Sequence, residues 1–197
     1  MTATSRWRAP DGNAARVVGV LLVWLSWTQG SAPAQQREAS ASEGRKTQTE
    51  AKVKVAYVFN FFKFIEWPET EGETGGPLRI CVVGRDEVCA LLEDLAGRKV
   101  KGRTIDVARI EDGRSFIACH VLYLGRQEGE RLETILQEIE GKPVLTVSDM
   151  PRFVQQGGMI GFDLNENRVK IVIRPKYLRR AGLIARAKLL EVATVVP

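Results

Sequence analysis

The chain has 197 residues, with 29 lysines and arginines, 24 aspartates and glutamates, and a formal net charge of +5 at pH 7. This length suits one domain with a sizeable core, preceded by an export signal. The basic residues form no dense block, so we exclude nucleic-acid binding as the main function and expect no nucleic-acid partner.

Residues 1–34 have the features of a cleaved export signal. Three arginines precede an apolar run, Val17 to Trp27, that is too short to span a bilayer. Small residues at 32 and 34 place cleavage after Ala34, with an uncleaved anchor as the alternative. Cleavage removes three arginines and one aspartate, which lowers the net charge to +3. We therefore expect a periplasmic protein.

The elements predicted after the signal alternate between helices and strands. Residues 35–50 lack apolar side chains beyond alanine and should form a flexible leader, so the domain covers residues 51–197. Strands are predicted at 78–83, 104–110, 120–124, 144–147, 158–164 and 168–174. Helices are predicted at 51–66, 87–96, 128–140, 175–181 and 187–194, with a turn and a short helix between 149 and 157. This alternation indicates an α/β fold: a single compact domain with a mixed, mostly parallel sheet flanked by helices and an antiparallel hairpin at one edge.

The first predicted helix, residues 51–66, carries its polar residues on one narrow stripe and is apolar elsewhere. Phe59 and Trp67 lie at the edges of this stripe. They are either ordinary packing residues or part of an exposed contact patch. With Lys63, which lies on the stripe, they are our candidate residues for binding a protein partner.

The sequence lacks the usual catalytic signatures. There is no G-x-S-x-G elbow, P-loop, G-x-G-x-x-G or C-x-x-C, so we expect no enzyme activity, no cofactor and no metal site. His120 follows Cys119, and adjacent strand residues point to opposite faces, so a structural histidine is favoured over a catalytic or metal-binding one. Gly157 and Gly158 lead into a strand, which indicates a helix stop and not a phosphate loop.

Two carboxylates, Asp86 and Asp149, follow predicted strands at the carboxyl ends where open α/β sheets bind ligands. Both positions also suit ordinary helix N-caps. With Ser148 they form the candidate ligand site of an alternative function, a periplasmic small-molecule sensor or solute-binding domain. A hydrolase that uses Asp149 is a third hypothesis, which rests on fold analogy alone.

The chain has three cysteines, Cys81, Cys89 and Cys119, of which two can pair in an oxidising compartment. Spacing alone does not say which two. Cys81 and Cys119 lie in two predicted strands and fit a disulfide if those strands are neighbours, about 4.8 Å apart. A buried pair of free thiols is the alternative, and Cys89 is the expected unpaired thiol.

Four segments together resemble the YfiR-like family of exported proteins. They are KVAYVFNFFKFIEWP from Lys54, LRICVVG from Leu78, CHVLYL from Cys119 and LTVSDMPRFVQQGGMIGF from Leu145. With the closing Lys188-Leu-Leu, the similarity covers essentially all of residues 51–194. The resemblance implies a compact periplasmic α/β domain without known catalysis.

The resemblance also implies a regulatory function. The best-understood members repress a membrane-bound diguanylate cyclase by binding its periplasmic part, and their release raises cyclic di-GMP and favours biofilm formation. We therefore expect the periplasmic domain of an inner-membrane diguanylate cyclase as the partner. By the same resemblance, an OmpA-like outer-membrane lipoprotein can sequester such a repressor, and members can form homodimers.

The family pattern favours a disulfide between Cys81 and Cys119, because the family cysteines in the strand motifs match these two. This chain departs from the pattern in three places. It has no cysteine after Cys119, which excludes redox control through a second pair in the C-terminal half. Arg174 stands where many members have asparagine, and Arg186-Ala187 replaces the more usual serines near the expected contact surface.

Overall fold

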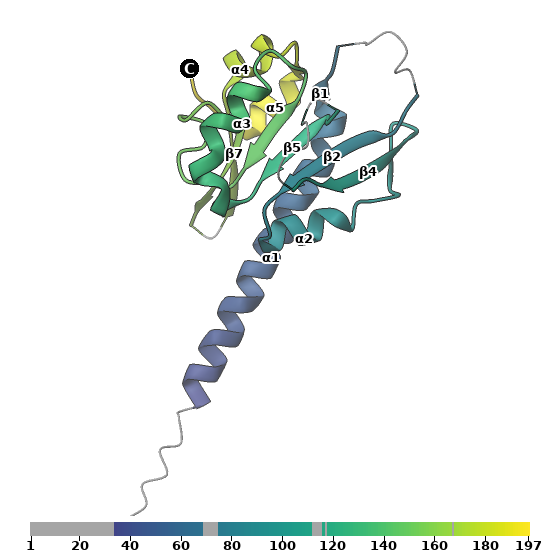
Figure 1. Cartoon of the computed structure of the whole chain (residues 1–197). Coiled ribbons are helices and arrows are strands. Elements are labelled where there is room, and N and C mark those ends of the chain that lie inside the picture. The colour runs from purple at the N-terminus through teal and green to yellow at the C-terminus, as the bar shows by residue number, and fades with distance from the viewer. Residues whose placement is uncertain (1–33, 69–74, 112–115, 117, 167) are drawn as a thin grey trace, which may run out of the picture.

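The computed structural model describes residues 34–68, 75–111, 116, 118–166 and 168–197, with side chains from residue 43 onward. The predicted export signal, apart from Ala34, lies outside this part. Within it, no helix combines the length and the apolar composition that crossing a membrane requires. The described chain forms one compact α/β domain from which the first helix projects (Figure 1), so the predicted fold class is confirmed.

The main sheet of the described chain has eight strands in the order β10-β8-β7-β6-β5-β2-β4-β3. They are β2 (Leu78–Val83), β3 (Lys99–Val100), β4 (Arg103–Arg109), β5 (Val121–Leu124), β6 (Leu145–Ser148), β7 (Ile160–Asn165), β8 (Arg168–Ile173) and β10 (Ala193–Val195). All neighbours are parallel except β3–β4 and β7–β8. Because β2, β5 and β6 are parallel neighbours, their carboxyl ends meet at one edge.

Helices cover both faces of the sheet. They are α1 (Ala34–Phe64), α2 (Glu87–Glu93), α3 (Leu132–Glu138), α4 (Pro175–Arg180) and α5 (Ala187–Val192), with the 3-10 helix η1 (Arg126–Arg131) before α3. Side chains alternate along β2, so Ile80 and Val82 pack in the core under α1 and α2. Cys81 and Val83 point to the other face and pack in a second core with α3.

Helix α1 starts seventeen residues before the predicted position. It runs unbroken from Ala34 to Phe64, and from Ala51 onward it buries apolar side chains such as Val58 and Phe61. All side chains at residues 43–49 are exposed. The extension follows because a helix with a packed end needs no new nucleus, and alanine, glutamate and lysine propagate it well.

The end of α1 also differs from the prediction. The helix stops at Phe64, and Ile65–Glu66 form β1, which pairs antiparallel with β9 (Ile184–Ala185). Ile65 is fully buried in this small second sheet. The closing segment is thereby fixed against the end of α1, a long-range pairing that no local pattern indicates.

The C-terminal prediction needs one correction. The final helix α5 ends at Val192, and Ala193–Val195 form β10, parallel to β8. The β-branched run at 194–196 favours an extended chain over a helix. The β7–β8 hairpin is antiparallel as predicted, but β10 covers it, so the hairpin is not the edge of the sheet.

Two smaller predictions are also corrected: the end of α2 and the short helix expected before Gly157. Helix α2 ends at Glu93 and not at 96, and residues 151–157 form consecutive turns where a short helix was predicted. Gly157 has φ +112°, as expected of a stop. A Cβ at Gly158 would lie 2.2 Å from the ring of Phe153, so only glycine fits there.

Cys81 and Cys119 form the disulfide that the family pattern favours, with Cα atoms 5.7 Å apart. Cys81 lies in β2, as predicted. Cys119 was also predicted to lie in a strand, but it precedes β5 by two residues. The bond therefore ties the loop that enters β5 to the middle of β2. Cys89 is buried in α2 without a disulfide partner.

Replacing both Cys81 and Cys119 by alanine should lower the free energy of unfolding by about 3–4 kcal/mol, because the bond closes a loop of 38 residues in the unfolded chain. Urea denaturation of the oxidised protein measures this loss. As a control, reductant should shift the midpoint of the wild type and leave that of the double variant unchanged. Equal midpoints for both oxidised proteins would contradict the prediction.

Candidate functional site: a buried polar cluster at the carboxyl edge of the sheet

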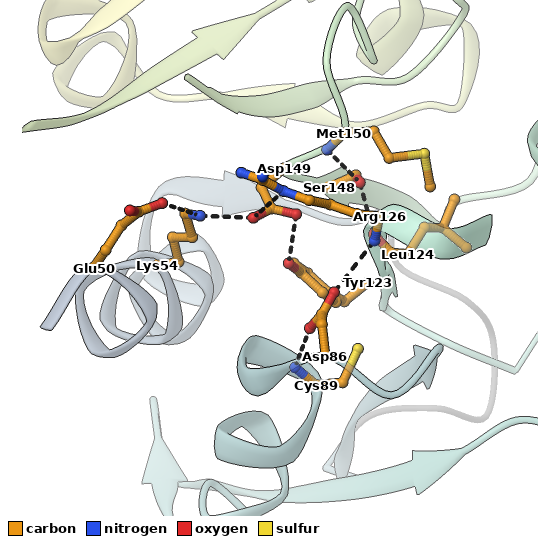
Figure 2. Close-up of polar contacts among 10 residues, drawn as sticks. All are labelled: Glu50, Lys54, Asp86, Cys89, Tyr123, Leu124, Arg126, Ser148, Asp149 and Met150. Atoms are coloured by element: carbon orange, nitrogen blue, oxygen red, sulfur yellow. Dashed lines mark hydrogen bonds and ion pairs between the residues drawn. The ribbon is translucent and has the colours of Figure 1, made fainter. Parts of the chain in front are cut away.

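Polar side chains gather where β2, β5 and β6 end (Figure 2). Asp86 follows β2, Arg126 follows β5 and Asp149 follows β6. The parallel register brings these ends together, and α1, at the left of the view, supplies Lys54. The structure thus unites Asp86, Ser148 and Asp149, the three residues of the predicted ligand site.

Asp149 lies at the centre of this polar cluster and is 6% exposed. Its Oδ2 accepts from Lys54 Nζ at 2.6 Å and lies 3.0 Å from Nε of Arg126. Lys54 is 4% exposed, and its Nζ also lies 2.5 Å from Oε1 of Glu50. Two cations and two carboxylates therefore balance, as buried charge requires.

Tyr123 completes the shell around Asp149. Its hydroxyl donates to Oδ1 of Asp149 at 3.3 Å, from a side chain with no exposed surface. Burial, and then the negative charge of Asp149, raise the pKa of Tyr123 far above its ordinary value. The phenol is therefore a neutral donor across the physiological range and does not act as a base.

Asp86 is the N-cap of α2, as one reading of the sequence predicted. Its Oδ1 accepts from the amide of Cys89 at 2.8 Å, and its Oδ2 accepts from the amide of Arg126 at 3.2 Å. A Cβ at Gly125 would lie 2.8 Å from Oδ2, so glycine allows this approach. Burial, and then the charge of Asp86, raise the pKa of the Cys89 thiol, which keeps it protonated and unreactive.

Ser148 is fully buried and links two strand ends. Its hydroxyl donates to the carbonyl of Leu124 at 2.6 Å and accepts from the amide of Met150 at 3.0 Å. Asp149 is thus held in place by its neighbour on the chain. Residues 148–150 form a turn in which the hydroxyl of Ser148, and not a backbone carbonyl, accepts from the amide of Met150.

The polar cluster can hold α1, α2 and the strand ends together, and its side chains already have hydrogen-bond or ion-pair partners. In the described chain no buried side-chain nitrogen or oxygen lacks a hydrogen-bond partner, and no group of acidic, histidine and cysteine residues could hold a metal. Among the ion-paired groups around Lys54 and Asp149, only Arg126 has a largely exposed side chain. A ligand at Asp149 would therefore have to displace an existing ion pair.

The three residues predicted to bind a partner do not form one exposed patch. Trp67 is half-buried, stacks on Phe62 and donates its indole N–H to the carbonyl of His120 at 3.1 Å. Phe59 is half-buried between α1 and α2, with the ammonium of Lys63 5.0 Å above its ring. Lys63 alone of the three is exposed.

His120 has structural contacts, in line with the favoured reading. Its Nδ1 accepts from the backbone amide of Arg79 at 3.1 Å, and its ring meets Trp67 edge-on at 6.0 Å. Sequence reasoning missed Lys54, Tyr123 and Arg126 as members of the polar cluster. Lys54 did carry a signal, because it is a charged residue within the otherwise apolar part of the helix.

A family model described as YfiR/HmsC-like matches residues 51–194. The chain belongs to this YfiR/HmsC-like family. The match covers the sheet except Val195 of the edge strand β10, the disulfide, and the polar cluster except Glu50. The resemblance inferred from the four sequence segments is therefore confirmed.

Lys54→Met should cost about 3–5 kcal/mol of unfolding free energy, because it leaves the buried Asp149 without its shortest ion pair. Adding Asp149→Asn removes that unmatched charge, so the double variant should lose clearly less than the sum of the single losses. Urea denaturation of the wild type, the two single variants and the double variant completes this double-mutant cycle. Lys52→Met, on an exposed neighbour, is the control and should stay within about 0.5 kcal/mol. Additive losses would contradict a buried pair.

Stability should fall as the pH rises above about 9, because Cys89 and Tyr123 stay protonated in the folded chain and lose their protons on unfolding. Each such group contributes a slope of about 1.4 kcal/mol per pH unit above its unfolded pKa. Tyr123→Phe should remove the contribution of Tyr123 to the fall of the unfolding free energy above pH ~10. Melting temperatures between pH 8 and 11 test this, and equal slopes for Tyr123→Phe and the wild type would refute it.

Proposed function

We propose that this YfiR/HmsC-like chain is a periplasmic regulatory protein that represses a membrane-bound diguanylate cyclase by binding the periplasmic domain of that enzyme. Family membership carries the proposal, since it supports a periplasmic regulator of a diguanylate cyclase at the level of the family. That this chain itself binds and represses a cyclase of its own bacterium is our inference.

The polar cluster supports a binding function more than a catalytic one. Its carboxylates and its lysine are engaged with one another, and burial holds Tyr123 and Cys89 in their neutral forms. None of these groups is poised to act as a nucleophile or a base at neutral pH. Such a domain can act by binding one conformation of a partner better than another.

The mechanism we propose is a population shift in the cyclase. A repressor that binds the inactive conformation about 1.4 kcal/mol more strongly than the active one shifts their ratio about tenfold. No chemical step is required of the repressor. Release of the repressor, for instance by an OmpA-like lipoprotein that sequesters it, would then restore cyclase activity.

The predicted contact surface stays part of the proposal, with Lys63 as its most accessible member. Phe59 adds a partly exposed ring beneath the ammonium of Lys63. Trp67 would act mainly by holding the end of α1 against His120. Lys63→Glu therefore tests direct contact with the least risk to the fold.

Deleting the gene in its own bacterium should raise cyclic di-GMP and biofilm mass, because the cyclase loses its repressor. Mass spectrometry of nucleotide extracts measures the rise. Expression with the export signal should restore the low level, whereas expression without residues 1–34 should not, since the protein then stays in the cytoplasm. In vitro, the mature protein should bind the purified periplasmic domain of a membrane cyclase, and Lys63→Glu should weaken this binding.

Two results would contradict the proposal. One is a deletion strain whose cyclic di-GMP stays unchanged under every growth condition tried. The other is a mature protein that binds none of the periplasmic cyclase domains of its own bacterium. Restoration by the unexported protein would contradict the periplasmic location alone.

A small-molecule sensor remains the alternative proposal, because Asp86, Ser148 and Asp149 do meet at the carboxyl edge. A ligand there would have to replace Arg126, the most exposed member of the cluster, at Asp149. Stabilisation of the folded protein by a periplasmic metabolite, lost in Asp149→Asn and kept in Arg126→Ala, would support this function over the regulatory one.

A further inference from the structure

A groove lies between the projecting part of α1 and the β7–β8 hairpin. Its volume is about 580 Å³, and its lining includes Arg45, Lys46, Val53, Tyr57, Leu164 and Arg168. We call it the hairpin groove. It shares none of its lining with Phe59, Lys63 or Trp67, the contact residues considered so far.

The floor of the hairpin groove is apolar and accessible. Val53 is 38% exposed and Leu164 is 53% exposed, so these two belong to the few large apolar side chains that the described chain leaves in contact with water. Tyr57 and Val169 extend the floor as half-buried side chains. Apolar side chains grouped in a groove with a polar rim are typical of protein interaction sites.

The rim of the groove is basic. Arg45, Lys46 and Arg168 face Glu50 as the one acidic residue of the lining, and the carboxylate of Glu50 already lies 2.5 Å from Lys54 Nζ. The formal charge of the lining is therefore +2. A favourable occupant combines apolar side chains with carboxylates at their flanks.

A second copy of the chain is a poor occupant of the same groove. A two-fold symmetric contact would place one basic rim against the other, which costs free energy through like-charge repulsion.

The exposed part of α1 would be stabilised by a bound partner. Side chains at residues 43–49 are all exposed, and a helical stretch with so few packing contacts is marginal in water by itself.

We propose that the hairpin groove docks an acidic amphipathic segment of the protein that this chain regulates; that the segment belongs to the cyclase rests on the proposed function. Its apolar side chains lie against Val53 and Leu164. Its carboxylates pair with Lys46 and Arg168 at the rim. The segment also covers residues 43–49 of α1, whose side chains are exposed.

The test uses the mature protein and two fluorescent helical peptides of about 18 residues, long enough to follow α1 along the groove. One carries leucine on one face and glutamate on its flanks, and the other has lysine in place of glutamate. The groove variants are Leu164→Asp and Lys46→Glu with Arg168→Glu. Arg179→Glu, an exposed reversal on α4, is the matched control. Circular dichroism checks that each variant is folded.

We expect the acidic peptide to bind at least tenfold more tightly than the lysine analogue. Both groove variants should weaken this binding at least tenfold, and Arg179→Glu should leave it unchanged. Equal binding of the two peptides, binding of neither, or full binding by the groove variants overturns the proposal. Binding to phosphatidylglycerol vesicles that the groove variants lose, without any binding of the acidic peptide, overturns it in favour of a lipid surface.

The purified periplasmic domain of the cyclase separates this proposal from the proposed function. Binding that both groove variants weaken supports the two together. Binding that all variants share leaves the regulatory function intact and overturns the groove as its docking site. If the acidic peptide binds as expected and no cyclase domain does, the groove proposal stands and the cyclase as partner is wrong.

Discussion

The ion pair between Lys54 and Asp149 fixes the first helix on the carboxyl edge of the sheet. Both side chains are almost fully buried, and their charged atoms are 2.6 Å apart. Burying one such charge alone costs several kcal/mol, so neither residue is tolerated without the other. Helix α1 therefore cannot slide or rotate on the sheet without exposing or separating the pair. The ion pair holds α1 in place together with the buried side chains of Val58 and Phe61 and the pairing of β1 with β9.

The same constraint explains why the carboxyl edge of the sheet is closed. In open α/β folds this edge binds ligands when its polar groups are left without internal partners. Here Asp149 has Lys54, Arg126 and Tyr123 around it, and Asp86 caps α2 while it accepts from the amide of Arg126. The polar residues of the edge stabilise the domain. The surfaces proposed to bind a partner lie elsewhere, around α1.

Sequence reasoning recovered what depends on local patterns. The alternation of apolar strands and amphipathic helices predicted the α/β sheet, and Asp86 was recognised as a cap from its position before a helix. The pairing of β1 with β9 and the addition of β10 to β8 were missed, because both join segments far apart in the chain. Lys54 was visible as a charge in an apolar helix, but its partner Asp149 is 95 residues away.

Helix α1 connects the polar cluster to the hairpin groove through one residue. Glu50 lines the groove and also pairs with Lys54, which in turn pairs with Asp149. A carboxylate bound in the groove would compete with Glu50 for the nearby cations, and a change at Glu50 alters the charge balance around Lys54. The groove and the core of the domain therefore share one set of ion pairs.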